Sequence, residues 1–140
     1  MRRYVLSIAF CITLLRVDHA QDDGMPHLDL VRGLRDRNYH DSALVYLEKL
    51  KAQQNRLSPE VKAALPLELA RSRSDVAGSI PPGSERDRLL QTSRTELEAF
   101  LKNNPSPGLA VEGEQALANC LAEQARSLAA AADRAGITTK

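Results

Sequence analysis

The sequence predicts an all-α fold built from antiparallel helix hairpins that stack as a short α-solenoid. Hydrophobic residues make up 43% of the chain and charged residues 26%, which is the composition of a globular protein rather than a disordered one. Outside the N-terminus, Val, Ile, Thr and aromatic residues never alternate with polar ones as a β-strand requires. Seven Gly and seven Pro residues fall at a few junctions between segments whose apolar residues recur at helical spacing.

The first 20 residues have the layout of a secretory signal peptide. Arg2 and Arg3 precede an apolar run over residues 4–15, and a polar stretch follows that ends in Ala20. The run is shorter than the roughly 20 apolar residues that a membrane-spanning helix needs. We therefore expect cleavage after Ala20 and export to the periplasm or cell envelope. The alternative is an uncleaved segment that anchors the protein in the inner membrane.

Cleavage would leave the chain nearly neutral. The 19 basic and 18 acidic residues become 16 and 17 when three Arg and one Asp are removed. This balance excludes the basic surface of a nucleic-acid-binding protein, so no nucleic-acid partner is expected. The alternating charges of the middle region are expected on a solvated helix face: Arg71, Arg73, Asp75, Glu85, Arg86, Asp87 and Arg88. Cys120, the one cysteine left, should pack as a small buried hydrophobe.

A flexible leader over residues 21–26 is expected to precede the helical domain, which spans residues 27–136 and begins with two helices. The first should run from Leu28 to about Arg37, since Leu30, Val31 and Leu34 recur at helical spacing. The second should begin near Ser42, where Asp41 is expected to cap it. Its apolar side is formed by Ala43, Leu44, Leu47 and Leu50.

The third helical region should begin at Ser58, because Ser58, Pro59 and Glu60 combine a capping hydroxyl, a first-turn proline and a first-turn carboxylate. Pro66 lies inside this region. Because an interior proline removes a hydrogen bond and clashes with the preceding turn, we expect a short helix, a break or kink near Leu65, and a second piece to about Ala77.

Residues 78–84 mark a boundary, and Ser84 with Asp87 has capping-box spacing at the start of the next helix. That helix has one apolar face: Leu89, Leu90, Ser93, Leu97, Phe100 and Leu101. Residues 103–108 form a turn, and the last helix runs to Ala135 before Gly136 stops it and residues 137–140 form a tail. Its packing stripe has heptad-like spacing: Leu117, Leu121, Gln124, Leu128, Ala131 and Ala135. The stripe is expected to pack against the preceding helix in an antiparallel hairpin. If the chain is a piece of a longer repeat protein, residues 108–135 should also expose an unmatched apolar face and self-associate.

Residues 28–50 resemble a tetratricopeptide (TPR) helix pair. Leu30 and Leu34 match apolar positions of the first TPR helix, and Ala43 and Leu47 match the small and large positions of the second. His27 stands where an aromatic residue is usual, and one extra residue separates Tyr39 from Ala43. Residues 96–125 are similar to the divergent TPR-like repeats of exported bacterial envelope proteins. The resemblance implies a helical-repeat fold with a scaffolding or binding role and brings no catalytic residue with it.

Tyr39, His40, Asp41 and Ser42 are the densest cluster of potentially reactive side chains. A catalytic triad needs nucleophile, base and carboxylate in line, whereas adjacent residues at a helix start point about 100° apart. We therefore interpret this cluster as a turn, in which Tyr39 packs between the paired helices and His40 is exposed.

Other chemistry has weaker support in the sequence. His27, His40 and Cys120 have no metal-ligand spacing, so neither a metal nor a cofactor is expected. Residues 81–86, PPGSER, could offer free amides to an anion but lack the Gly-rich and Lys elements of a P-loop. Two carboxylate pairs are read as surface charges: Glu96 with Glu98, and Glu112 with Glu114.

We therefore expect an exported, non-enzymatic helical-repeat module that binds a protein partner or an envelope scaffold. It would contact a membrane only through an uncleaved N-terminal segment. The alternative from another class is a purely structural N-terminal segment of a larger envelope protein.

Overall fold

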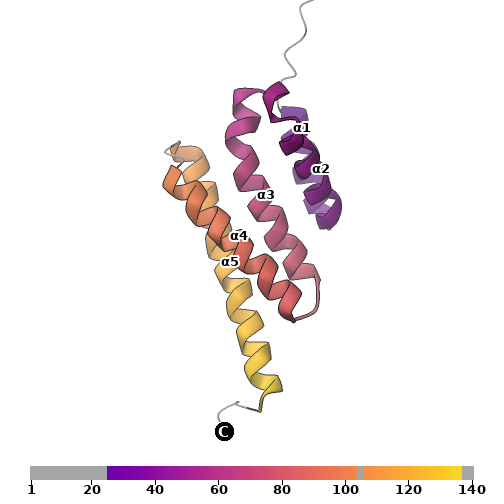
Figure 1. The fold of residues 1–140 in the computed structure, drawn as a ribbon, viewed down its shortest axis with the longest axis vertical. Helices are drawn as coiled ribbons and strands as arrows, with labels where there is room; N and C mark the ends of the chain where they lie inside the picture. The colour runs from indigo at the N-terminus through magenta and orange to yellow at the C-terminus, as the bar shows by residue number, and fades with distance from the viewer. Residues whose placement is uncertain (1–24, 104–105, 137–140) are drawn as a thin grey trace, which may run out of the picture.

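The computed structural model describes residues 25–103 and 106–136 and contains five α-helices in these ranges (Figure 1). They are α1 (Met25–Asp36), α2 (His40–Ala52), α3 (Pro59–Ser79), α4 (Ser84–Asn103) and α5 (Pro107–Arg134). A short 3-10 helix, Gln54–Arg56, lies between α2 and α3. The part of the chain that the structure describes contains no strand, so the prediction of an all-α protein is confirmed.

Helix α3 lies at the centre of the molecule. It contacts all four other helices, while α1 packs against α2 and α4 packs against α5. Figure 1 shows the α1–α2 pair on one side of α3 and the α4–α5 pair on the other. Each chain reversal is short, so consecutive helices run in opposite directions.

Several helix ends lie where the sequence placed them. The Ser58 hydroxyl accepts a hydrogen bond from the Val61 amide at 3.4 Å, and Pro59 is the first residue of α3. Ser106 precedes Pro107 at the start of α5, and Gly136 follows its end with a φ of 69°. At that φ a residue without a Cβ is favoured, which explains why the helix stops there.

Of the break or kink predicted near Leu65, the break is wrong, because α3 runs without interruption from Pro59 to Ser79. The Pro66 ring is exposed, whereas Leu65 and Leu67 on either side of it are buried. Burial of the neighbouring side chains on both sides of α3 holds the helix together where the amide hydrogen bond is lost.

The turn between α1 and α2 is closed by the backbone and not by Asp41. Asn38 has a left-handed φ of 62°, the Tyr39 amide donates to the Leu34 carbonyl at 2.9 Å, and the Asn38 amide donates to the Arg35 carbonyl at 2.8 Å. These two bonds form a Schellman motif with asparagine in the glycine position. Helix α2 then begins at His40, so Asp41 lies inside its first turn, and the predicted Asp41 cap is wrong.

The core is divided along α3. One cluster joins the first two helices to the N-terminal half of α3 through Val31, Ala43, Leu47, Leu50, Leu65 and Leu69. The other joins α3 to the last two helices through Leu67, Ala70, Ala77, Leu90, Leu97, Phe100, Ala116 and Cys120. The apolar face predicted for α4 is confirmed, and so is the burial of Cys120, which is fully buried.

Helix α5 packs through only part of its predicted stripe: Leu117 is partly buried against the core, but other leucines of the stripe are exposed. Leu121 is 41% exposed and Leu128 is 71% exposed, while α5 buries Gly113, Ala116, Cys120 and Ser127. A Cβ on Gly113 would lie 2.8 Å from Leu101 Cδ2, so α4 approaches the α5 backbone too closely for a side chain there. Because α4 lies so close, α5 packs against it through small residues, and Leu121 and Leu128 stay exposed.

Candidate functional site

The residues Tyr39–Ser42 lie at the α1–α2 turn and in the first turn of α2. Tyr39 is 57% exposed, so its predicted packing between the helices is wrong. Asp41 and Ser42 are exposed in the first turn of α2. His40 is half-buried rather than exposed, and its Nδ1 atom is buried without a hydrogen-bond partner. His40 therefore differs in burial from Asp41 and Ser42, the two neighbours with which the sequence grouped it.

His40 instead lines a polar groove of about 600 Å³. The groove is formed by the α1–α2 turn, the C-terminal half of α3 and the middle of α5. Its lining residues are Asn38, His40, Ser74, Asp75, Gly78, Ser79, Asn119, Ala122, Glu123 and Arg126. Amide, hydroxyl, acidic and basic groups from three separate segments thus converge on one concave surface, the polar groove.

Asp75 is the acidic group of this groove whose titration is altered. Burial raises the pKa of the Asp75 carboxyl above its ordinary value of 3.8, and the positive charges of Arg35, His40 and Arg71 oppose that rise. Arg35 Nε lies 4.0 Å from Asp75 Oδ2. Asp75 is therefore a partly desolvated carboxylate held within an electropositive cluster.

A buried ion pair lies next to Asp75. Arg35 Nη1 of α1 lies 2.6 Å from Glu68 Oε2 of α3, and the side chains are 10% and 2% exposed. Arg71 approaches the same glutamate at 3.9 Å and Glu112 of α5 at 3.5 Å. This network links α1, α3 and α5 along the side of α3 that leads to the polar groove.

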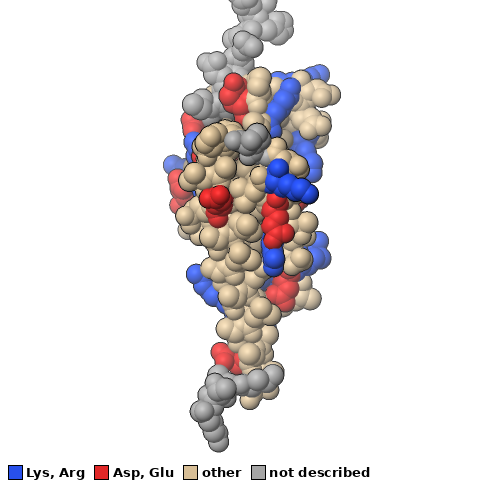
Figure 2. Space-filling model, turned by 90° about the vertical axis from the view of Figure 1, so that its left-hand side faces the viewer, with Lys and Arg blue, Asp and Glu red and all other residues tan. Residues whose placement is uncertain are grey.

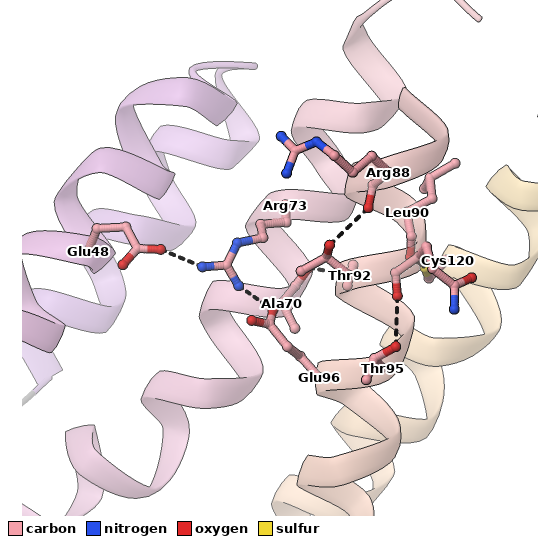
Figure 3. Close-up of polar contacts among 11 residues, drawn as sticks. Glu48, Ala70, Arg73, Arg88, Leu90, Thr92, Thr95, Glu96 and Cys120 are labelled. Carbon is pink, nitrogen blue, oxygen red and sulfur yellow. Dashed lines mark hydrogen bonds and ion pairs between the residues drawn. The ribbon is translucent and has the colours of Figure 1, made fainter. Parts of the chain in front are cut away.

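The solvated face predicted for residues 71–88 is wrong for three of its arginines. Arg71 pairs as described, and Arg73 of α3 donates to Glu48 of α2 and Glu96 of α4 (Figure 3). Arg86 is buried and donates to Glu123 at 2.7 Å and to the Ile80 carbonyl at 3.2 Å. These charges bridge helices because the long arginine side chains reach across gaps that apolar side chains do not fill. Glu85 and Arg88 are exposed, as predicted.

The remaining candidates also find structural partners. Asp87 does not complete a capping box but accepts a hydrogen bond from the Ser127 hydroxyl at 2.5 Å. The Pro82 carbonyl accepts from Arg134 Nη1 at 3.2 Å, so the PPGSER segment contacts the end of α5. Glu96 and Glu112 take part in ion pairs between helices, whereas Glu98 pairs with Arg94 on the surface and Glu114 is exposed.

His27 contacts Tyr46 of α2. His27 Nδ1 lies 2.5 Å from the Tyr46 hydroxyl, which joins α1 to α2. Over residues 25–103 and 106–136, no group of three or more His, Cys, Asp and Glu side chains is placed to hold a metal ion.

Parts of the predicted organisation lie outside the described residues. These are the signal segment 1–20 with Cys11, positions 21–24 of the leader, residues 104–105 and the tail 137–140. Positions 25–26, predicted as leader, belong to α1. In the ranges that the structure covers, no helix is both long and apolar enough to cross a membrane.

Sequence reasoning missed the Arg35–Glu68 pair and the α5 side of the polar groove. The available signal was the position of Glu68, which follows Val61 and Leu65 at helical spacing and so lies where an apolar residue is expected. Asn119, Glu123 and Arg126 gave no such signal, because polar residues on a long helix usually face solvent. Comparison with protein-family models, with curated proteins and with solved structures finds no match for this chain.

Proposed function

We propose that this chain is an exported, non-enzymatic TPR-like module that binds an extended segment of a protein partner in the polar groove. The observation that carries the proposal is the composition of that groove. The residues that line the groove come from three segments that are separated in sequence: the α1–α2 turn, α3 and α5.

The packing order supports the repeat architecture. Besides contacts between consecutive helices, α1 packs against α3 and α3 packs against α5. Helical repeats bury their apolar faces in this way, because each hairpin stacks on the first helix of the next. In such an arrangement α1, α3 and α5 share one layer and offer a continuous surface to a ligand.

The chemistry of the polar groove supports a polypeptide ligand. The carboxamides of Asn38 and Asn119 can each donate and accept, which matches the alternating N–H and C=O groups of an extended backbone. Asp75 adds a negative charge that would select side chains, and the ion pair of Glu123 with Arg126, which also includes Arg86, borders the groove. The proposal includes no catalysis, because adjacent side chains at a helix start point about 100° apart and cannot align as a catalytic triad.

Site-specific photocrosslinking in the host cell tests the binding site. A photoreactive residue at Asn119, which lines the polar groove, should form an adduct with one defined protein. The matched control is the same residue at Ala118, which is exposed on α5 but does not line the groove. Equal adducts at both positions, or none at either, would contradict the groove and favour a purely structural segment of a larger envelope protein.

Export is tested separately by mass spectrometry of the protein isolated from its host. A mature N-terminus at Gln21 in the periplasmic fraction is the expected result. An intact Met1 in the membrane fraction would replace the cleaved signal with an inner-membrane anchor, and the binding proposal would stand unchanged.

A further inference from the structure

A second groove, on the other face of α3, lies between α2 and α4. It has a volume of about 350 Å³, within the range of ligand sites, and is lined by Lys51, Gln54, Lys62, Leu65, Pro66, Leu69, Glu96, Ala99, Phe100 and Asn103. The α3 residues 62, 65, 66 and 69 are three, four and seven positions apart, so they share one helix face. We call this site the α2–α4 groove.

The bottom of the α2–α4 groove is apolar. Leu65, Leu69 and Phe100 are 4%, 5% and 4% exposed, and they come from the two separate parts of the core. Pro66 and Ala99 are exposed beside them and add apolar surface. The position of Pro66 inside α3 thus places a rigid ring at this groove, in a helix that continues in spite of it.

The border of the α2–α4 groove is polar, and its free charges are positive. Lys51 and Lys62 are exposed and make no ion pair with any residue that the structure describes. The single acidic lining residue, Glu96, is already paired with Arg73, which also holds Glu48 across the gap between α2 and α4 (Figure 3). Gln54 and Asn103 add carboxamide donors.

We propose that the α2–α4 groove binds an amphipathic carboxylate, with the chemistry of a medium-chain fatty acid. The aliphatic chain would cover Leu65, Leu69 and Phe100, where burial of apolar surface favours binding. The carboxylate would lie against Lys51 and Lys62, which have no other counter-ion among the described residues. This site is separate from the polar groove and does not depend on the protein partner proposed above.

An NMR titration of the isotopically labelled protein with decanoate below its micellar concentration tests the proposal. On addition of decanoate, the largest changes in backbone amide chemical shift should occur at Leu65, Leu69 and Phe100. Decanol, which has the same chain without the charge, should bind roughly tenfold more weakly, since two exposed charge pairs are lost. Acetate, which has the charge without the chain, should give no saturable shift.

Substitutions then assign the two parts of the site. Lys51→Gln with Lys62→Gln should weaken decanoate binding roughly tenfold and leave decanol binding unchanged. The control pair Lys49→Gln with Lys102→Gln has the same net charge at exposed positions outside the α2–α4 groove, and should bind decanoate like the parent. Ala99→Phe should block both ligands by filling the groove, while circular dichroism reports an intact fold.

Two results would overturn the proposal. One is equal binding of decanoate and decanol that the Lys51 and Lys62 substitutions do not change, because the site would then recognise no charge. The other is a set of shifts confined to Leu121 and Leu128 of α5, which would place the ligand on a different apolar surface. Either result leaves the crosslinking test of the polar groove unaffected.

Discussion

At the scale of single residues, the polar groups buried between helices set this protein apart from a plain apolar bundle. Ser93 Oγ donates to the Ala70 carbonyl at 2.7 Å, and Cys120 Sγ lies 3.4 Å from the Leu90 carbonyl. Together with the Arg35–Glu68 pair, these contacts fix how far each helix can slide along its neighbour, because a buried polar group is costly without its partner.

Asp75 should make the free energy of unfolding fall as the pH rises, whereas most acidic residues in folded proteins have the opposite effect. Its pKa is raised in the folded protein, so both states hold the proton well below pH 3.8, and as the pH rises the unfolded chain loses it first. Folding stability contributed by Asp75 is therefore present at low pH and falls as the pH rises through its raised pKa. Asp75→Asn should remove this loss. Its free energy of unfolding, measured relative to that of the parent, should therefore be more favourable at pH 7 than at pH 3.5.

Urea unfolding of the parent and Asp75→Asn at several pH values measures that difference, since the effects of all other groups cancel in the comparison. Asp36→Asn, at an exposed position, controls for the change in net charge. A difference between Asp75→Asn and the parent that stays constant with pH would contradict the assigned role of burial.

At the scale of helices, the fit between α4 and α5 depends on the small side chains of α5. Gly113 is buried, and a Cβ built there would lie 3.1 and 3.2 Å from atoms of the Phe100 ring as well as against Leu101. Gly108, in the first turn of the same helix, has no atom within 4 Å of its Cβ position. The two glycines therefore differ in tertiary environment although both are helical.

Gly113→Ala and Gly108→Ala should change stability in opposite directions. Alanine improves helix propensity by up to about 1 kcal/mol at either site. At Gly113 the overlap with buried Phe100 costs about 1–3 kcal/mol, so we expect net destabilisation, whereas Gly108→Ala should stabilise. Thermal and denaturant unfolding of both variants provides the test, and stabilisation by Gly113→Ala would show that α4 can move away without cost.

At the scale of the whole molecule, α3 unites two core regions and α5 keeps an uncovered apolar side. Leu121 and Leu128 lie seven residues apart on that side, and Figure 2 shows that the lower part of the molecule, formed by α5, is mostly uncharged. A groove of about 340 Å³ beside them is lined by Asp87, Gln91, Arg94, Gln124 and Leu128. Exposed apolar surface of this kind favours association.

We expect the protein to self-associate through this side of α5. Sedimentation velocity over a range of concentrations should show a reversible dimer that Leu121→Gln with Leu128→Gln abolishes, because less apolar surface can be buried. Val111→Gln is the matched control, since Val111 is 66% exposed but lies on a different side of α5. A monomer at every concentration would contradict the expectation.

The sequence by itself determined the helices and most of their ends. Helical spacing of apolar residues, the Ser58–Pro59 and Ser106–Pro107 starts and the Gly136 stop act within a few residues, so local physics is sufficient to predict them. The Pro66 break failed because tertiary burial of Leu65 and Leu67 outweighs a local penalty. The all-α class followed from the same local signals.

Only the tertiary structure decided which helix faces meet and where the grooves lie. The heptad spacing of Leu121 and Leu128 was a valid helical pattern, yet both are exposed. Helix α4 packs against the small residues of α5, because close approach of two helices gives dense interior packing. Likewise, Asn38, Asp75 and Arg126 are far apart in sequence and converge on the polar groove only through the packing of α1, α3 and α5. Contacts between distant segments depend on shape and burial, which no local pattern encodes.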